Sequence, residues 1–188
     1  MRIARSSPAA AGLVALAGLA LAAPAAAEET TCRGAIGTAT VDNLRVPQNA
    51  TCTLDRTVVK GTVKVERAAT LNARGVRVNG NVQGENARNV NITAGSDVGG
   101  SVQVKQGGGA KVLDSSITAD IQYDSNRSLL EASRNRVGGS IQVVKNTGGV
   151  RIASNRVNGN LQCKENRPAP TGGGNVVQGN KEDQCARL

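Results

Sequence analysis

The feature that most constrains the fold of this chain is a short motif that recurs every 19 or 20 residues. The motif reads apolar, any residue, small, polar, apolar, and its last residue falls at positions 63, 82, 102, 121, 141 and 161. A weaker copy spans 177–180, and Leu44 lies where a first copy would end. A period of this length is typical of solenoids, in which each repeat buries its apolar residues against its neighbours.

A second apolar pair recurs between successive motifs, with one residue between its two members. Alternation at every second residue is the period of a strand, and glycine runs such as 107–109 separate the apolar segments as turns do. Parallel crossovers favour the right hand. We therefore expect an all-β fold, a single-stranded right-handed parallel β-helix of about seven coils with 19–20 residues per coil. The pairs are Leu71/Ala73, Val90/Ile92, Ala110/Val112, Leu130/Ala132 and Val150/Ile152.

The N-terminal segment indicates export. Arg2 and Arg5 precede an apolar run at 9–23, and three alanines at 25–27 form a cleavage site, so residues 1–27 read as a signal peptide. The rest, 28–188, is predicted as one β-helix domain with an N-terminal cap at 28–43, coils at about 44–166 and a C-terminal cap at 167–188. We expect a protein secreted to the periplasm or beyond after cleavage near Ala27, with no transmembrane segment in the mature chain.

Four cysteines can pair in three ways, and the repeat chooses among them. Cys32 and Cys52 are 20 residues apart, and Cys163 and Cys185 are 22 apart, so each pair falls on adjacent coils. Adjacent coils lie within the Cα separation that a disulfide requires, whereas any other pairing would span most of the rod. We predict Cys32–Cys52 and Cys163–Cys185, which would staple the two ends.

Several polar residues recur at the same step and predict ladders along the stack. Asn135, Asn155 and Asn175 would form a short ladder at a turn. An outward ladder of side-chain amides that can bond along the stack is predicted for Gln83, Gln103, Gln122, Gln142 and Gln162.

The units at 59–63 and 78–82 resemble those of bactofilins, the polymer-forming bacterial β-helices, and the same periodicity covers 41–180. The chain is also similar to small secreted bacterial right-handed β-helix proteins of unassigned activity. These resemblances imply a bacterial β-helix. Bactofilins are cytoplasmic and lack signal peptides, so their filament role does not follow from the likeness.

Composition restricts the chemistry that the chain could perform. It has no His, so the commonest general base and the usual catalytic triads are absent. No aromatic platform for bases or sugar rings is visible, because Phe and Trp are missing and Tyr occurs once. The sequence therefore gives no specific nucleic-acid signal, and it predicts no resident metal or cofactor.

The remaining candidates for catalysis are carboxylates. Glu66 and Glu85 occupy equivalent positions on neighbouring coils, and Asp120 and Asp124 follow two coils later on the same broad face. Paired acids could bind calcium or act on a glycosidic bond. They would serve a polysaccharide lyase or hydrolase acting on an acidic polysaccharide, the only case in which we expect calcium. The sequence favours the plainer interpretation that these residues lie in solvated turns.

Basic residues outnumber acidic ones in 28–188 by 21 to 14. A positively charged exported protein favours anionic partners, and Arg136 and Arg156, on adjacent coils, are candidates to hold a phosphate or an acidic sugar. Since no catalytic set is recognisable, the sequence favours a non-catalytic structural, adhesive or binding protein of the envelope or extracellular space. Its expected partner is an anionic cell-surface polymer or a second copy of itself.

Overall fold

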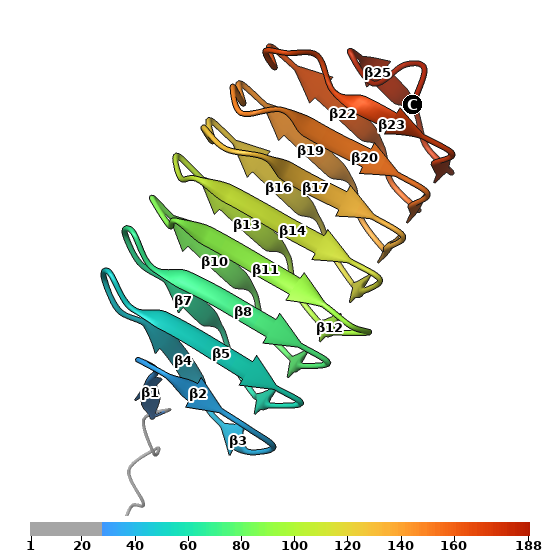
Figure 1. The fold of residues 1–188 in the computed structure, drawn as a ribbon. Helices are drawn as coiled ribbons and strands as arrows, with labels where there is room; N and C mark the ends of the chain where they lie inside the picture. Colours follow the sequence, from blue (N-terminus) through green and yellow to red (C-terminus); the bar gives the residue numbers. More distant parts are fainter. Residues whose placement is uncertain (1–27) are drawn as a thin grey trace, which may run out of the picture.

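The computed structural model describes residues 28–188, and the predicted signal peptide lies outside them. These residues form a rod of three parallel sheets, each strand of which pairs with its equivalent one coil away (Figure 1). Sheet A contains β1 (Glu29–Thr31), β4 (Asn43–Val46), β7 (Val63–Val65), β10 (Val82–Glu85), β13 (Val102–Lys105), β16 (Ile121–Asp124), β19 (Ile141–Val144), β22 (Leu161–Lys164) and β25 (Lys181–Asp183).

Sheet B follows sheet A in each coil, and sheet C, made of two-residue strands, follows sheet B. Sheet B contains β2 (Ala35–Ile36), β5 (Thr51–Asp55), β8 (Thr70–Arg74), β11 (Asn89–Thr93), β14 (Gly109–Leu113), β17 (Leu130–Ser133), β20 (Val150–Ala153) and β23 (Thr171–Gly173). Sheet C contains β3 (Thr40–Val41), β6 (Val58–Val59), β9 (Arg77–Val78), β12 (Asp97–Val98), β15 (Ser116–Ile117), β18 (Arg136–Val137), β21 (Arg156–Val157) and β24 (Val176–Val177).

The predicted fold class is confirmed. The described residues contain strands and turns without an α-helix, and the chain, followed from blue to red in Figure 1, winds in a right-handed sense. The seven strands of sheet A from β4 to β22 lie in the segment predicted as coils. The segments predicted as caps extend the same sheets, because β1–β3 and β23–β25 continue the parallel pairing at each end.

The core is built from columns of side chains that point inward from equivalent positions. Residues such as Val63, Val82 and Val102 are fully buried and stack in register along sheet A. Burial of one such side chain contributes about 1.5–3 kcal/mol. Tyr123 is also fully buried, and its hydroxyl donates a hydrogen bond to the carbonyl of Glu131 at 3.0 Å. Burial raises the pKa of the Tyr123 phenol. Because the ring is fully buried, it fills the core and offers no exposed stacking surface.

Buried asparagines hold two of the three corners of the coil. At the corner between sheets B and C, the Oδ1 of Asn155 accepts from the backbone N–H of Asn135, and the Nδ2 of Asn155 donates to the carbonyl of Ala132. The predicted ladder of three asparagines is therefore present and buried. A second ladder lies between sheets A and B, and it consists of Asn126, Asn146, Asn166 and Gln184.

The corner between sheets C and A carries a ladder of mixed residue types. Each side-chain oxygen accepts from the backbone N–H of the equivalent residue in the next coil, and a glycine column beside it leaves little room: a Cβ on Gly80 would lie 2.7 Å from the carbonyl oxygen of Gly61. The ladder consists of Asn43, Thr62, Asn81, Ser101, Asp120, Ser140, Asn160 and Asn180.

Both predicted disulfides are present. Cys32 and Cys52 join the first coils with a Cα–Cα distance of 5.5 Å, and Cys163 and Cys185 join the last with 5.2 Å. All four cysteines are buried in the core cluster, so each staple holds an end of the hydrophobic core closed. Paired cysteines are typical of proteins that fold in an oxidising compartment outside the cytoplasm.

Replacing Asn146 with Ala should lower the free energy of unfolding by about 3 kcal/mol, because it removes the side chain that accepts from the buried backbone N–H of Asn126 and donates to the carbonyl of Tyr123. Urea unfolding followed by circular dichroism measures the change. The exposed Asn158 is the matched control, and Asn158→Ala should change stability by less than about 0.5 kcal/mol. Equal effects of the two substitutions would contradict the ladder's role.

Removing the N-terminal disulfide with Cys32→Ala and Cys52→Ala should cost about 3 kcal/mol, because the cross-link no longer restricts the unfolded chain. Urea unfolding measures this loss. Peptide mapping without reductant provides the check on pairing, and a cross-linked peptide that joined Cys32 or Cys52 to Cys163 or Cys185 would refute the register.

Candidate functional site

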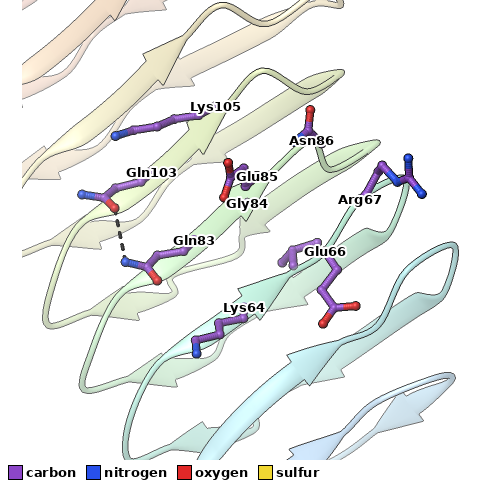
Figure 2. Close-up of a pocket in the computed structure, with 10 residues that line it drawn as sticks. Lys64, Glu66, Arg67, Gln83, Gly84, Glu85, Asn86, Gln103 and Lys105 are labelled. Atoms are coloured by element: carbon purple, nitrogen blue, oxygen red, sulfur yellow. Dashed lines mark hydrogen bonds between the residues drawn. The ribbon is translucent and has the colours of Figure 1, made fainter.

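The structure separates the four candidate acids. Glu66 follows β7, and its carboxylate accepts from the backbone N–H of Gln48 at 2.9 Å and from Arg45 at 3.2 Å. The Gln48 hydrogen bond, followed by that of Arg45, holds the pKa of Glu66 below its usual range. Because both partners belong to the preceding coil, the Glu66 carboxylate is turned away from Glu85, as Figure 2 shows.

The other three acids do not converge either. Glu85 and Asp124 stand in one outward column of sheet A, but Lys105 is in register between them on β13. Asp120 was expected on the same face and is instead at the corner between sheets C and A. There its Oδ1 accepts from the N–H of Ser140 at 2.7 Å, which makes Asp120 a member of the mixed ladder. Its spacing reflects a structural role that the residue type alone does not reveal.

The glutamines of the predicted ladder stand in one column of sheet A, but within residues 28–188 only Gln83 and Gln103 bond to each other through their amides. Gln83, Gln103, Gln122, Gln142 and Gln162 are in register and half-buried. Along this column the Nε2 of Gln83 donates to the Oε1 of Gln103 at 3.3 Å. The column continues into Lys64 at one end and Glu182 at the other.

A hollow of about 540 Å³ lies on the outer face of sheet A around β10; we call it the sheet A hollow (Figure 2). Gly84 stands in an inward column that Val65 and Val104 occupy on the neighbouring strands. A Cβ on Gly84 would lie 2.8 Å from the Cγ2 of Val90, which is too close for a real contact. A side chain at position 84 would therefore require Val90 or the backbone of β10 to shift. The hollow is lined by Lys64, Val65, Glu66, Arg67, Gln83, Gly84, Glu85, Asn86, Gln103 and Lys105.

A second hollow, more open and of about 660 Å³, follows the corner between sheets B and C; we call it the arginine groove. Arg77, Arg136 and Arg156 all lie in one column of sheet C, with Asp97 and Ser116 between Arg77 and Arg136. The groove is lined by Arg77, Gly95, Ser96, Asp97, Asp114, Ser115, Ser116, Arg134, Asn135, Arg136, Ser154 and Arg156.

Arg136 and Arg156 form an exposed pair of like charges, as expected from the sequence. They are directly in register on β18 and β21, where neighbouring strands are about 4.8 Å apart. Among residues 28–188, no carboxylate oxygen lies within 4.0 Å of either guanidinium. Like charges placed opposite each other on a sheet repel, so an anion that bridged the two would relieve an unfavourable contact.

Arg134, at the edge of the same groove, is already engaged. Its Nε and Nη2 donate to the two carboxylate oxygens of Asp114 at 2.6 and 2.8 Å. This bidentate hydrogen bond holds the pKa of the Asp114 carboxyl below its usual range and raises that of Arg134. The structure thus distinguishes a neutralised arginine from the two that face solvent beside it.

Residues 28–188 contain neither a cluster of metal ligands nor a membrane-spanning helix. No three side chains of His, Cys, Asp or Glu in this segment gather closely enough to hold a metal ion. No helix in it is long and apolar enough to cross a membrane.

Comparisons with protein-family models, with curated proteins and with solved structures found no match. The candidate sites therefore rest on the geometry of this chain.

Sequence reasoning placed the arginine pair and the glutamine column correctly but missed the sheet A hollow. The signal was available: Gly84 replaces the valine that the repeat has at positions 65 and 104. It could have been found by asking which inward position lacks a side chain.

Acid should weaken the fold partly through Asp114. A carboxyl whose pKa is lowered by folding stabilises the native state above its unfolded pKa of about 3.9, and that contribution is lost as the pH falls through the lower, folded pKa. Arg134→Gln removes the cause of the shift, so the stability gap to wild type should be largest near pH 6 and shrink towards pH 2.

Urea unfolding across this pH range measures the gap. Arg136→Gln is the matched control, because Arg136 has no carboxylate within 4.0 Å among the described residues and its gap should not depend on pH. An Arg134→Gln gap that stayed constant with pH would contradict the role of the ion pair.

Proposed function

We propose that this chain is a non-catalytic exported binding protein that holds an anionic polymer along the arginine groove. The observation that carries the proposal is the pair Arg136 and Arg156, in register on adjacent strands and without a carboxylate partner in residues 28–188. Guanidinium groups bind phosphate, sulfate and carboxylate groups through paired N–H donors. Two of them at strand spacing suit a ligand that repeats its charge.

The shape of the groove supports a linear ligand. Its lining comes from successive coils, from Arg77 on β9 to Arg156 on β21, so the groove runs along the axis of the rod. Ser116 and Ser154 add hydroxyl groups beside the arginines. The excess of basic residues in 28–188 would attract such a polymer from a distance, in a manner that salt screens.

The arrangement of the acids favours binding over the alternative of a polysaccharide lyase or hydrolase. Glu66 is held by Arg45 and Gln48, and Asp120 serves a backbone ladder. Glu85 and Asp124 are two coils apart, about 10 Å along the sheet, with Lys105 between them. Turnover of an acidic polysaccharide with calcium, abolished by Glu85→Gln, would decide for the enzyme.

Export is part of the proposal. Residues 1–27 have the composition of a signal peptide, and the two disulfides suit an oxidising destination such as the periplasm or the extracellular space. A bacterial source and the bactofilin-like character of the repeats stay expectations from the sequence. Self-association is a separate expectation, and sedimentation of the mature chain over a range of concentrations tests it.

Retention of the mature chain on immobilised dextran sulfate tests the groove, with uncharged dextran as the blank. We expect retention at low salt, loss of retention at high salt, and at least a fivefold weaker affinity for Arg136→Gln with Arg156→Gln. Removing two arginines that bind the same anion abolishes their paired hydrogen bonds to it, in addition to part of the long-range electrostatic attraction.

The matched control is Arg88→Gln with Arg127→Gln, which removes the same charge from exposed residues outside the groove. It should bind within twofold of the wild type. Equal weakening by both double variants would show that net charge, and not the arginine pair, governs binding. No retention of the wild type at low salt would overturn the proposal.

A further inference from the structure

We propose that the sheet A hollow is a second binding site, specific for a short run of sugar acids, that is, pyranose rings bearing a carboxylate. The sheet A hollow shares no residue with the arginine groove, and sheet A contributes no strand to that groove. The inference therefore stands independently of the function proposed above.

The hollow is a built feature of the fold. Along the inward column of sheet A, Gly84 alone among Val46, Val65, Val104, Tyr123, Val143 and Cys163 lacks a side chain. The Cγ2 of Val90 lies where a Cβ on Gly84 would clash with it, so the inward space at Gly84 is already filled. A depression of about 540 Å³ on an otherwise regular sheet is within the size range of small-molecule sites.

Two lysines supply the positive charge. Lys64 on β7 and Lys105 on β13 flank β10, and Figure 2 shows both side chains on the same side as Gln83 and Gln103. Both lysines are exposed, and within residues 28–188 neither has a carboxylate oxygen within 4.0 Å. Their strands are about 10 Å apart, so each ammonium group would meet the carboxylate of a different sugar unit.

The two glutamines between the lysines match hydroxyl groups. The Nε2 of Gln83 donates to the Oε1 of Gln103, which fixes the orientation of both amides. Within residues 28–188 the Oε1 of Gln83 and the Nε2 of Gln103 make no other side-chain hydrogen bond, so the first can accept from a ligand and the second can donate to it. A sugar hydroxyl both donates and accepts, so one ring edge can satisfy the pair.

The acids in the hollow restrict the kind of anion. The lining of the hollow contains three basic residues, Lys64, Arg67 and Lys105, and two acids, Glu66 and Glu85. The Glu66 carboxylate is committed to Arg45 and Gln48, whereas Glu85 lines the hollow beside Gly84. A carboxylate in this position repels a densely charged polymer and can accept from hydroxyls. A ligand whose carboxylates alternate with hydroxyl groups fits the charge pattern better than polyphosphate does.

Calorimetric titration of the mature chain with trigalacturonate tests the site, and maltotriose serves as the uncharged probe. We expect trigalacturonate to bind and maltotriose to bind at least tenfold more weakly. Lys64→Gln with Lys105→Gln should weaken trigalacturonate binding at least tenfold without changing the core. Gly84→Ala, whose Cβ would clash with Val90 and reshape β10, should weaken binding with both lysines kept.

The matched control is Lys111→Gln with Lys181→Gln, two exposed lysines outside the hollow, which should bind within twofold of the wild type. The groove variant, Arg136→Gln with Arg156→Gln, should also keep trigalacturonate binding while its affinity for dextran sulfate falls at least fivefold. The proposal is overturned if the wild type does not bind trigalacturonate, if both lysine pairs weaken it equally, or if only the groove variant does. None of these three results would alter the dextran sulfate test of the arginine groove.

Discussion

The structure depends on the hydrogen bonds that tie each turn to the same turn one coil away. Strand pairing alone leaves the corners of a solenoid without partners, and buried backbone groups there would each cost about 1–3 kcal/mol. At the corner between sheets B and C, the Oδ1 of Asn155 accepts from the backbone N–H of Asn135. Between sheets A and B, the Oδ1 of Asn146 accepts from the backbone N–H of Asn126 in the same way. Because each amide bonds both the backbone and the next amide, a slip of one residue would break a whole ladder.

A fixed register has consequences for the surface. Residues at equivalent positions must stack at strand spacing, whatever their charge. The period of the sequence therefore decides which side chains share an outward column. In one column Lys105 separates Glu85 from Asp124, which gives alternating charges. In another, Arg136 and Arg156 are forced together. The same register thus produces one column in which opposite charges alternate and another in which two positive charges are adjacent. An anion is favoured at the second column.

The repeat made most of the fold predictable, including the winding, the disulfides and the columns of Gln83 and Arg136, because a solenoid turns sequence distance directly into spatial distance. Two kinds of feature escaped. The ladder through Thr62, Ser101 and Asp120 was hidden because different residue types perform one task, accepting from the next backbone N–H. The hollow at Gly84 was hidden because it lies beside an inward position without a side chain, and a sequence pattern marks the side chains that are present.

The central claim, that buried asparagines lock the coils in register, is tested most directly by residue-resolved hydrogen exchange. The backbone N–H groups of Asn126, Asn135, Asn146 and Asn155 lie in turns, yet each donates to the Oδ1 of an asparagine in the next coil. They should exchange as slowly as the strand amides of sheet A, through opening of the whole stack. Exchange of these four amides at the rate of freely exposed turns would contradict the account.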